Sequence, residues 1–550
     1  MSLSLRPATL VERENLQTIA LLALAVLLGA FLRLGPVLSA DFALNDGGLF
    51  YTLVQDIRAA GYSLPLYGSY NGISIPFAYP PLALYLAALL ADLTGVPLVE
   101  LLRFFPAAVS ILAIPAFYLL GRVLLQSRTQ ALLALFAFAL LPQGFTKYIM
   151  GGGLTRAPGT LFALLALQQA DLLYRRRQLR FAWTAALFAG LAVLSHPEAA
   201  WLTCYSGALL FLFHGRHRRG LVGTLIVVAV VLLLTGPWWL TVILRHGPAP
   251  LLAAAETARE PWYSWFPRLA FYFTADLDYV VASLTTVGLV GLAFALARRH
   301  LLLPLWLVAI FILSPRASAT FAAIPLALLV GIGLDQVILP GVRRLAQGGA
   351  STGAGGAAPA QGAPGRPARR RSAVLAGTLL VLFLVQVLLS AWLRLSFWSP
   401  IPVLPREDRD AFHWIAGNTA QDSRFVVIAA DNPYWNPVEE WFPVLAGRAS
   451  LTTVQGYEWL PGGQYARQLE RCAGPFRCMA QEADCLEDWA RGYGESFSHV
   501  YISPGRAGPA EGAGFCPVLA DSLRASADYL PLYDRGGVMV FARLAAGGGP

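Results

Sequence analysis

Long apolar stretches constrain this chain more than any other feature of its sequence. A bilayer core about 30 Å thick requires about 20 apolar residues per helix. Only 13% of the residues are charged, whereas soluble globular domains are about 25% charged. This composition excludes an ordinary soluble enzyme. We predict a mainly α-helical fold in which residues 1–394 form a polytopic membrane bundle of about eleven transmembrane helices. The predicted spans are 16–38, 101–124, 129–142, 157–174, 181–195, 199–213, 220–243, 279–297, 301–314, 317–339 and 373–394.

The loops between these spans differ in positive charge. If the N-terminus lies inside, the inner loops hold 19 Lys and Arg residues and the outer loops hold seven. Cytoplasmic loops are enriched in these residues, so we predict a cytoplasmic N-terminus. Residues 79–94 are apolar enough for a twelfth span, but that span would place the inner arginine clusters outside. We expect 79–94 to form a helix in the outer membrane interface; a true span, with topology set by other signals, is the alternative.

Residues 395–550 differ from the membrane part in net charge and in their pattern of polar and apolar residues. They carry a net charge of −6, whereas residues 1–394 carry +15. We predict a soluble extracytoplasmic α/β domain over 395–550, with an amphipathic helix and three strands. These elements are expected at 406–416, 424–430, 499–502 and 537–542. Between the two parts, the Gly-, Ala- and Pro-rich residues 340–372 are predicted to form a disordered cytoplasmic linker.

The net charge of +9 therefore indicates orientation in a membrane, and we expect no nucleic acid partner. The expected location is the plasma membrane, with membrane lipids as partners. The sequence contains no P-loop, no nucleotide-binding glycine motif and no zinc-protease motif.

Four of the five cysteines lie in the predicted outer domain, at Cys472, Cys478, Cys485 and Cys516. An even number of cysteines in an oxidising location predicts one or two disulfides, with the pairing left open. A zinc site is the rival interpretation, but these cysteines form no CxxC pair and have no histidine among them.

The predicted first outer loop, residues 39–100, contains the most informative acids. Asp41 and Asp46 lie five residues apart, and Gly47 and Gly48 follow Asp46. The glycines permit a tight turn that presents the Asp46 carboxylate and then begins a helix at about residue 49. A carboxylate in this place suits catalysis, and a helix-capping role is the structural alternative.

The order of features along this loop resembles the GT-C class of multi-span glycosyltransferases, which includes protein O-mannosyltransferases and lipid A aminoarabinose transferases (glycosyltransferase family 39-like). The resemblance covers most of residues 1–200. It rests on a first span ending near Arg33, an acid-bearing turn at Asn45–Gly48, a short helix with Asp56, a Gly61…Pro65 turn, the Tyr79–Tyr85 segment (YPPLALY) and a span opening at Leu101–Pro106 (LLRFFP).

The resemblance implies an enzyme that moves a sugar from a polyprenyl-phosphate carrier to an acceptor at the outer membrane face. Asp46 aligns best with the family's catalytic acid, and Asp41 is the second candidate. A carboxylate would act as general base toward an acceptor hydroxyl, with inversion at the anomeric carbon. The family commonly has a second acid where this chain has Gly47-Gly48. A divalent cation is therefore an open option, and its ligands are unknown.

Cations are needed at such a site to stabilise the departing lipid phosphate. The outer-face candidates are Arg316, Lys147 and Arg156, and Lys147 is the only lysine in the chain. The alternative is that the two arginines anchor helices at the lipid headgroups and that the single lysine reflects composition.

Three further residues are candidates for substrate binding. His196 and Glu198 belong to a His-Pro-Glu turn between two predicted spans, and Tyr79 belongs to the interface segment. A Pro-broken turn with interfacial polar groups is the alternative for the first two. In the outer domain, residues 435–459 combine tryptophans with carboxylates, which suits either acceptor recognition or a core under a loop.

The sequence therefore predicts an inverting membrane glycosyltransferase that uses a polyprenyl-phosphate-linked sugar donor. Its acceptor, a glycan, lipid or protein, would lie at the extracytoplasmic face. The alternative is a non-catalytic membrane protein, either a glycan-assembly scaffold or a transporter. Transporters place polar groups and broken helices at mid-membrane, whereas here the polar groups gather at one face.

Overall fold

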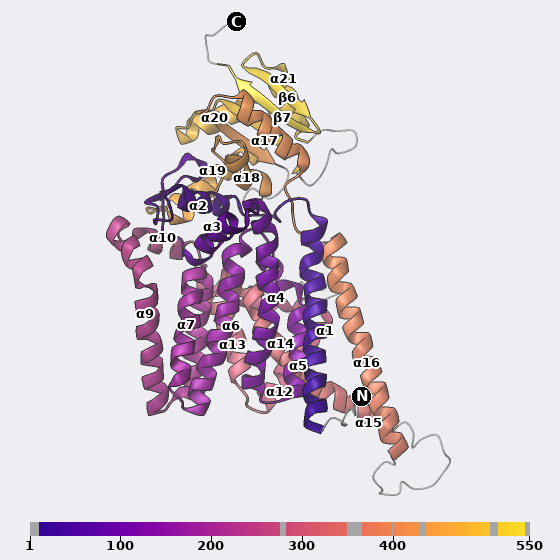
Figure 1. Ribbon diagram of the computed structural model, residues 1–550. Coiled ribbons are helices and arrows are strands. Elements are labelled where there is room, and N and C mark those ends of the chain that lie inside the picture. The colour runs from indigo at the N-terminus through magenta and orange to yellow at the C-terminus, as the bar shows by residue number, and fades with distance from the viewer. Residues whose placement is uncertain are drawn as a thin grey trace, which may run out of the picture.

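The computed structural model describes residues 10–274, 282–348, 366–398, 400–429, 436–505 and 515–544. Long helices form a bundle, and a sheet with flanking helices lies beyond one end of it (Figure 1). The chain is mainly helical, as predicted. Each of the eleven predicted spans coincides with a helix in its described residues.

The bundle helices are α1 (Leu10–Ser39), α4 (Leu98–Leu125), α5 (Arg128–Leu140), α6 (Gly153–Arg176), α7 (Arg180–Ser195), α8 (Pro197–Leu210), α9 (Arg218–His246), α12 (Ala282–Ala297), α13 (Leu302–Leu313), α14 (Ser318–Gly333) and α16 (Arg366–Leu393). Several of them are shorter than a bilayer requires. Within the described residues, five helices are long and apolar enough to cross a membrane, or up to seven if two bent pairs each count as one span. The chain is a multi-pass membrane protein, and the number eleven stays a prediction.

Proline residues set several of the helix ends. Helix α8 begins at Pro197, where the absent N–H group leaves no hydrogen bond unmade. Helix α5 ends shortly before Pro142, and a turn of 82° follows it. The chain between α5 and α6 therefore folds back as two short 3-10 turns, Pro142–Gly144 and Thr146–Tyr148.

Short elements cover the end of the bundle nearest the sheet (Figure 1). They are α2 (Gly48–Ala59), the hairpin β1 (Tyr67–Gly68) and β2 (Ile75–Pro76), α3 (Leu82–Thr94) and α10 (Ala249–Glu256). Helix α11 (Trp265–Thr274) follows α10 along the chain. The predicted interface segment 79–94 thus contains a helix of 13 residues, and Figure 1 places it beside α2 at this end.

The C-terminal part is an α/β unit around a five-stranded sheet of order β4-β3-β5-β7-β6. Strand β3 pairs in parallel with β4 and β5, and β7 is antiparallel to β5 and β6. The strands are β3 (Arg424–Ala429), β4 (Ala449–Ser450), β5 (His499–Ser503), β6 (Tyr529–Arg535) and β7 (Val538–Arg543). The helices are α17 (Arg406–Asn418), α18 (Pro437–Leu445), α19 (Gln464–Cys478), α20 (Asp484–Tyr493) and α21 (Pro517–Ala525).

One hydrophobic core joins the first outer loop to this sheet. It contains Phe50 of α2 and Leu84 of α3 together with Trp441 of α18, Phe425 of β3 and Tyr501 of β5. A separate core fills the opposite face of the sheet, and a third fills the bundle. The sheet unit is therefore packed against the loop helices by shared apolar burial.

One prediction about the segment that joins the bundle to the C-terminal unit needs correction. The disordered linker predicted over 340–372 is helical at both ends, because α15 (Leu339–Gly348) and the start of α16 occupy them. The remaining residues, 349–365, lie outside the described residues. The four cysteines of the C-terminal unit form one disulfide, Cys478–Cys485, in agreement with the predicted one or two, while Cys472 and Cys516 are free thiols. Helix α19 ends at Cys478, and the chain returns to Cys485 within seven residues.

A candidate active site between the first outer loop and helix α6

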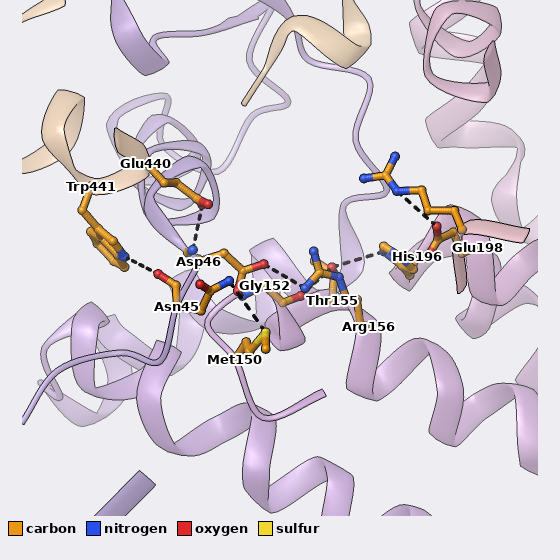
Figure 2. A network of polar contacts seen from close by, with 12 residues as sticks. Asn45, Asp46, Met150, Gly152, Thr155, Arg156, His196, Glu198, Glu440 and Trp441 are labelled. Atoms are coloured by element: carbon orange, nitrogen blue, oxygen red, sulfur yellow. Dashed lines mark hydrogen bonds and ion pairs between the residues drawn. The ribbon is translucent and has the colours of Figure 1, made fainter. Parts of the chain in front are cut away.

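Asp46 is buried in a turn immediately before α2. The turn requires unusual backbone angles, with φ of 52° at Asn45 and 135° at Gly47. Asparagine tolerates positive φ better than most residues, and glycine has no steric penalty there. The turn directs the Asp46 carboxylate toward the start of α6 (Figure 2).

Both oxygens of this carboxylate accept a hydrogen bond from the α6 region. The Gly152 amide donates to Oδ1 at 2.8 Å, and Arg156 Nη1 donates to Oδ2 at 2.8 Å. The Arg156 guanidinium compensates the carboxylate charge within the buried site. Each oxygen has a second lone pair, so the carboxylate can still accept a proton or a further hydrogen bond.

Glycines make this close approach possible. A Cβ atom at Gly151 would lie 1.8 Å from the Asp46 carbonyl oxygen, and one at Gly152 would lie 2.4 Å from Asp46 Oδ2. The Gly151 amide also donates to the Leu44 carbonyl at 2.9 Å. Gly151 and Gly152 thus form the surface against which the Asp46 turn packs.

A second set of polar side chains lies beside the Asp46–Arg156 pair. The Tyr79 hydroxyl contacts His196 Nδ1 at 2.9 Å and Thr155 Oγ1 at 3.0 Å, and His196 Nε2 lies 3.5 Å from Glu198 Oε2. Burial lowers the pKa of His196, so the imidazole is neutral at pH 7. A tautomer protonated at Nε2 satisfies both contacts, since Nδ1 then accepts from Tyr79.

Cations surround a small cavity next to His196. Its volume is about 20 Å³, and its lining includes Lys147, Arg156, His196 and Glu198. Arg316 Nε lies 3.9 Å from Glu198 Oε1 at the same place. Three cations, Lys147, Arg156 and Arg316, thus lie close to the carboxylates of Asp46 and Glu198. A cavity of this size holds about one water molecule, and a phosphate requires these side chains to move apart.

The C-terminal unit also reaches the site. Glu440 and Trp441 of α18 contact the Asp46 turn, and the ring of Trp459 lies 5.4 Å from that of Tyr79. Sequence reasoning did not assign these residues to the site. Their only signal was the concentration of tryptophans and carboxylates over residues 435–459.

The structure brings together seven of the eight predicted site residues: Asp46, Tyr79, Lys147, Arg156, His196, Glu198 and Arg316. Asp41 is apart from them. Its side chain is 67% exposed and forms an ion pair with Arg409 of α17. Within the described residues, no three His, Cys, Asp or Glu side chains lie close enough to hold a metal ion.

No model of a known protein family and no curated protein sequence matches this chain. Solved structures do match it. The archaeal oligosaccharyltransferase AglB from Archaeoglobus fulgidus, in complex with an inhibitory peptide and a dolichol-phosphate, aligns with a TM-score of 0.57 at 15% identity, over 89% of this chain and 69% of AglB. ArnT from Cupriavidus metallidurans, bound to undecaprenyl phosphate, aligns with a TM-score of 0.53 at 15% identity, over 97% and 99% of the two chains.

Arabinofuranosyltransferase AftD from mycobacteria aligns over 95% of this chain with a TM-score of 0.53 at 16% identity, and the match spans 41% of AftD. At these identities the likeness is one of fold. The chain has the fold of the GT-C membrane glycosyltransferases, as its resemblance to that class predicts.

Proposed function

We propose that this protein is an inverting glycosyltransferase that moves a sugar from a polyprenyl-phosphate-linked donor to an acceptor hydroxyl at the extracytoplasmic membrane face. The buried Asp46–Arg156 pair, beside a cation-lined cavity, is the observation that carries this proposal. Two proteins of similar fold were solved with dolichol-phosphate or undecaprenyl phosphate, which supports a donor of this class.

Asp46 is the proposed general base. An acceptor hydroxyl oxygen attacks the anomeric carbon and transfers its proton to the Asp46 carboxylate. The bond between the anomeric carbon and the phosphate oxygen breaks, and the polyprenyl phosphate leaves with the electron pair. Attack opposite the leaving group inverts the configuration. Asp41 has no part in this step, because it is exposed and paired with Arg409.

The proposed role of Lys147, Arg156 and Arg316 is to stabilise the negative charge that develops on the leaving phosphate. The cavity is too small for a phosphate as it stands. Donor binding would separate these cations from Glu198 and Asp46 and replace ion pairs within the protein by pairs with the phosphate.

Tyr79, His196 and Glu198 are proposed to bind sugar hydroxyls. Their hydroxyl, imidazole and carboxylate groups supply donors and acceptors at one place, and the Tyr79 ring adds an apolar surface. Neutral His196 can donate through Nε2 to a sugar oxygen. That atom is buried, and its contact with Glu198 Oε2 is long, at 3.5 Å.

We also propose the eleven-span topology with a cytoplasmic N-terminus. Helix α1 begins at the end of the bundle far from the sheet, and α2, which directly follows the Asp46 turn, lies at the end near the sheet (Figure 1). A cytoplasmic N-terminus would therefore place both the site and the α/β unit outside the cell. An oxidising exterior also suits the Cys478–Cys485 disulfide.

The test is transfer of a labelled sugar from a panel of undecaprenyl-phosphate-linked and dolichol-phosphate-linked sugars in proteoliposomes. Asp46→Asn should lower kcat by at least about 100-fold, since general-base catalysis supplies about 10²–10⁴-fold. Asp41→Asn is the matched control and should retain turnover within about threefold. Normal turnover by Asp46→Asn, at unchanged expression, would exclude Asp46 as the base. Solute transport without sugar transfer from any donor would favour the transporter.

A further inference from the structure

The two residues that flank Asp46 are both held by α18 of the C-terminal unit. The Gly47 amide donates a hydrogen bond to Glu440 Oε1 at 2.8 Å, and Trp441 Nε1 donates to the Asn45 carbonyl at 3.2 Å (Figure 2). Glu440 and Trp441 are themselves neighbours in the chain. Two consecutive residues of one helix thus fix the backbone on both sides of the proposed base.

Close packing accompanies these hydrogen bonds. A Cβ atom at Gly48 would lie 2.4 Å from the Glu440 carbonyl oxygen, and one at Gly47 would lie 3.0 Å from Trp441 Cζ2. The Trp441 ring is fully buried and contacts Phe42 edge to face at 4.8 Å. No side chain other than glycine fits between the turn and α18, so the turn cannot move without moving the helix.

Helix α18 is anchored on both of its sides. The Tyr70 hydroxyl donates to the Glu440 carbonyl at 2.7 Å from the loop side, and Thr453 Oγ1 donates to the Glu439 carbonyl at 2.8 Å from within the C-terminal unit. The Asn436 side chain caps the helix by accepting from the Val438 amide at 2.8 Å. These bonds hold α18 in place, so that the helix can fix the position of the turn.

We propose that Glu440 is a positioning residue for Asp46. By accepting the hydrogen bond of the Gly47 amide, the Glu440 carboxyl group holds Asp46 in its reactive position. This inference rests on the proposed role of Asp46 as the base. It makes the C-terminal unit part of the reaction site in addition to any part it has in acceptor recognition.

The charge of Glu440 matters because charged groups face it from the turn and from α6. These are Asp46 and Arg156, and Tyr70 faces it from the loop. Burial, and then the negative charge of Asp46, raise the pKa of Glu440 to about 8. At neutral pH the carboxyl group is therefore mainly uncharged and accepts the Gly47 bond without repelling Asp46. Above that pH, two carboxylates would face each other, and their repulsion would push Asp46 away from Glu440 against the Gly47 hydrogen bond.

The first experiment is the pH dependence of kcat for three variants. Glu440→Ala should lower kcat about 10- to 100-fold, since misplacement by about 1 Å can cost that much, while KM for the donor changes by less than about threefold. Glu440→Gln keeps the acceptor without the charge, so it should retain neutral-pH activity and lack the alkaline decline near pH 8 that we expect of the parent. Glu439→Gln is the matched control, a buried acid on the same helix without a contact to the turn, and should keep the parental profile.

The second experiment needs no activity and separates this inference from the proposed function. Hydrogen–deuterium exchange of residues 44–50 should be at least about tenfold faster in Glu440→Ala than in the parent or Glu439→Gln at the same pH. Unchanged exchange in Glu440→Ala would overturn the inference even if Asp46 proved to be the base. A Glu440→Gln variant that kept the alkaline decline would likewise overturn the role of its charge. Faster exchange without any sugar transfer would support the contact while contradicting the reaction.

Discussion

The contact between Gly151 and Asp46 offers a sharp test, because a single methyl group should displace the carboxylate. In Gly151→Ala, the new Cβ atom would lie 1.8 Å from the Asp46 carbonyl oxygen, 2.8 Å from its carbonyl carbon and 3.0 Å from Gly47 Cα. All three are backbone atoms, so no flexible side chain can turn away. The Asp46 turn must move by at least about 1 Å before the first contact reaches even 3.0 Å.

This displacement has two expected effects. Overpacking in a close-packed site costs about 1–3 kcal/mol of stability, so the melting temperature in detergent should fall. A shift of about 1 Å at the base should lower kcat about 100-fold. Gly207→Ala is the matched control, since a Cβ atom there meets no atom within 4 Å and alanine favours a helix. The reasoning would be refuted if Gly151→Ala turned over the donor as fast as the parent with an unchanged melting temperature.

Three further predictions concern stability and topology. Reduction of Cys478–Cys485, or Cys485→Ser, should destabilise the C-terminal unit by about 2–3 kcal/mol, from the loop-closure entropy of its short loop; an unchanged denaturation midpoint after reduction would contradict this. His196 is neutral in the folded protein because burial lowers its pKa below the ordinary 6.5. The unfolded chain therefore binds more protons below pH 6.5, and stability should fall there by at most about 1.4 kcal/mol per pH unit. Thermal melts from pH 7.5 to 5 should show this loss in the parent and a smaller one in His196→Gln, and equal losses would rule it out. In a Cys204→Ser background, cysteines at the exposed positions 126 and 178 should react from the cytoplasm and those at 63 and 410 from the exterior; any exchange between the two pairs would exclude the proposed topology.

The sequence predicted the helical parts of the fold well, because a membrane span and an amphipathic helix each have a strong local period. It also selected most of the side chains that the structure brings together around Asp46. Asp46, Lys147 and His196 stood out because a charged or titratable group is costly near a membrane unless it has a partner or a function. Their partners come from different helices, and the structure shows them together.

The sequence did not predict the contacts between distant parts of the chain. Glu440 and Trp441 lie 393 and 396 residues from their partners in the Asp46 turn, and no local pattern encodes such a pairing. Gly47-Gly48 was interpreted as a turn signal, yet the close approach of α18 also requires both glycines. Asp41 and Asp46 could not be ranked by spacing, because only the folded structure shows that one is exposed and the other buried.

The core shared by the first outer loop and the sheet has a consequence for biogenesis. At about 5–20 residues per second, the ribosome needs roughly 20–80 s to reach Glu440 after it has made Gly47. During that interval this core lacks the cover that the C-terminal unit supplies in the folded protein, such as the contact of Trp441 with Phe42. A truncated chain would insert its helices yet never complete the Asp46 turn. If Asp46 has its proposed role, a nascent chain would stay inactive until its C-terminal unit had docked on this turn, and a prematurely terminated chain would never become active.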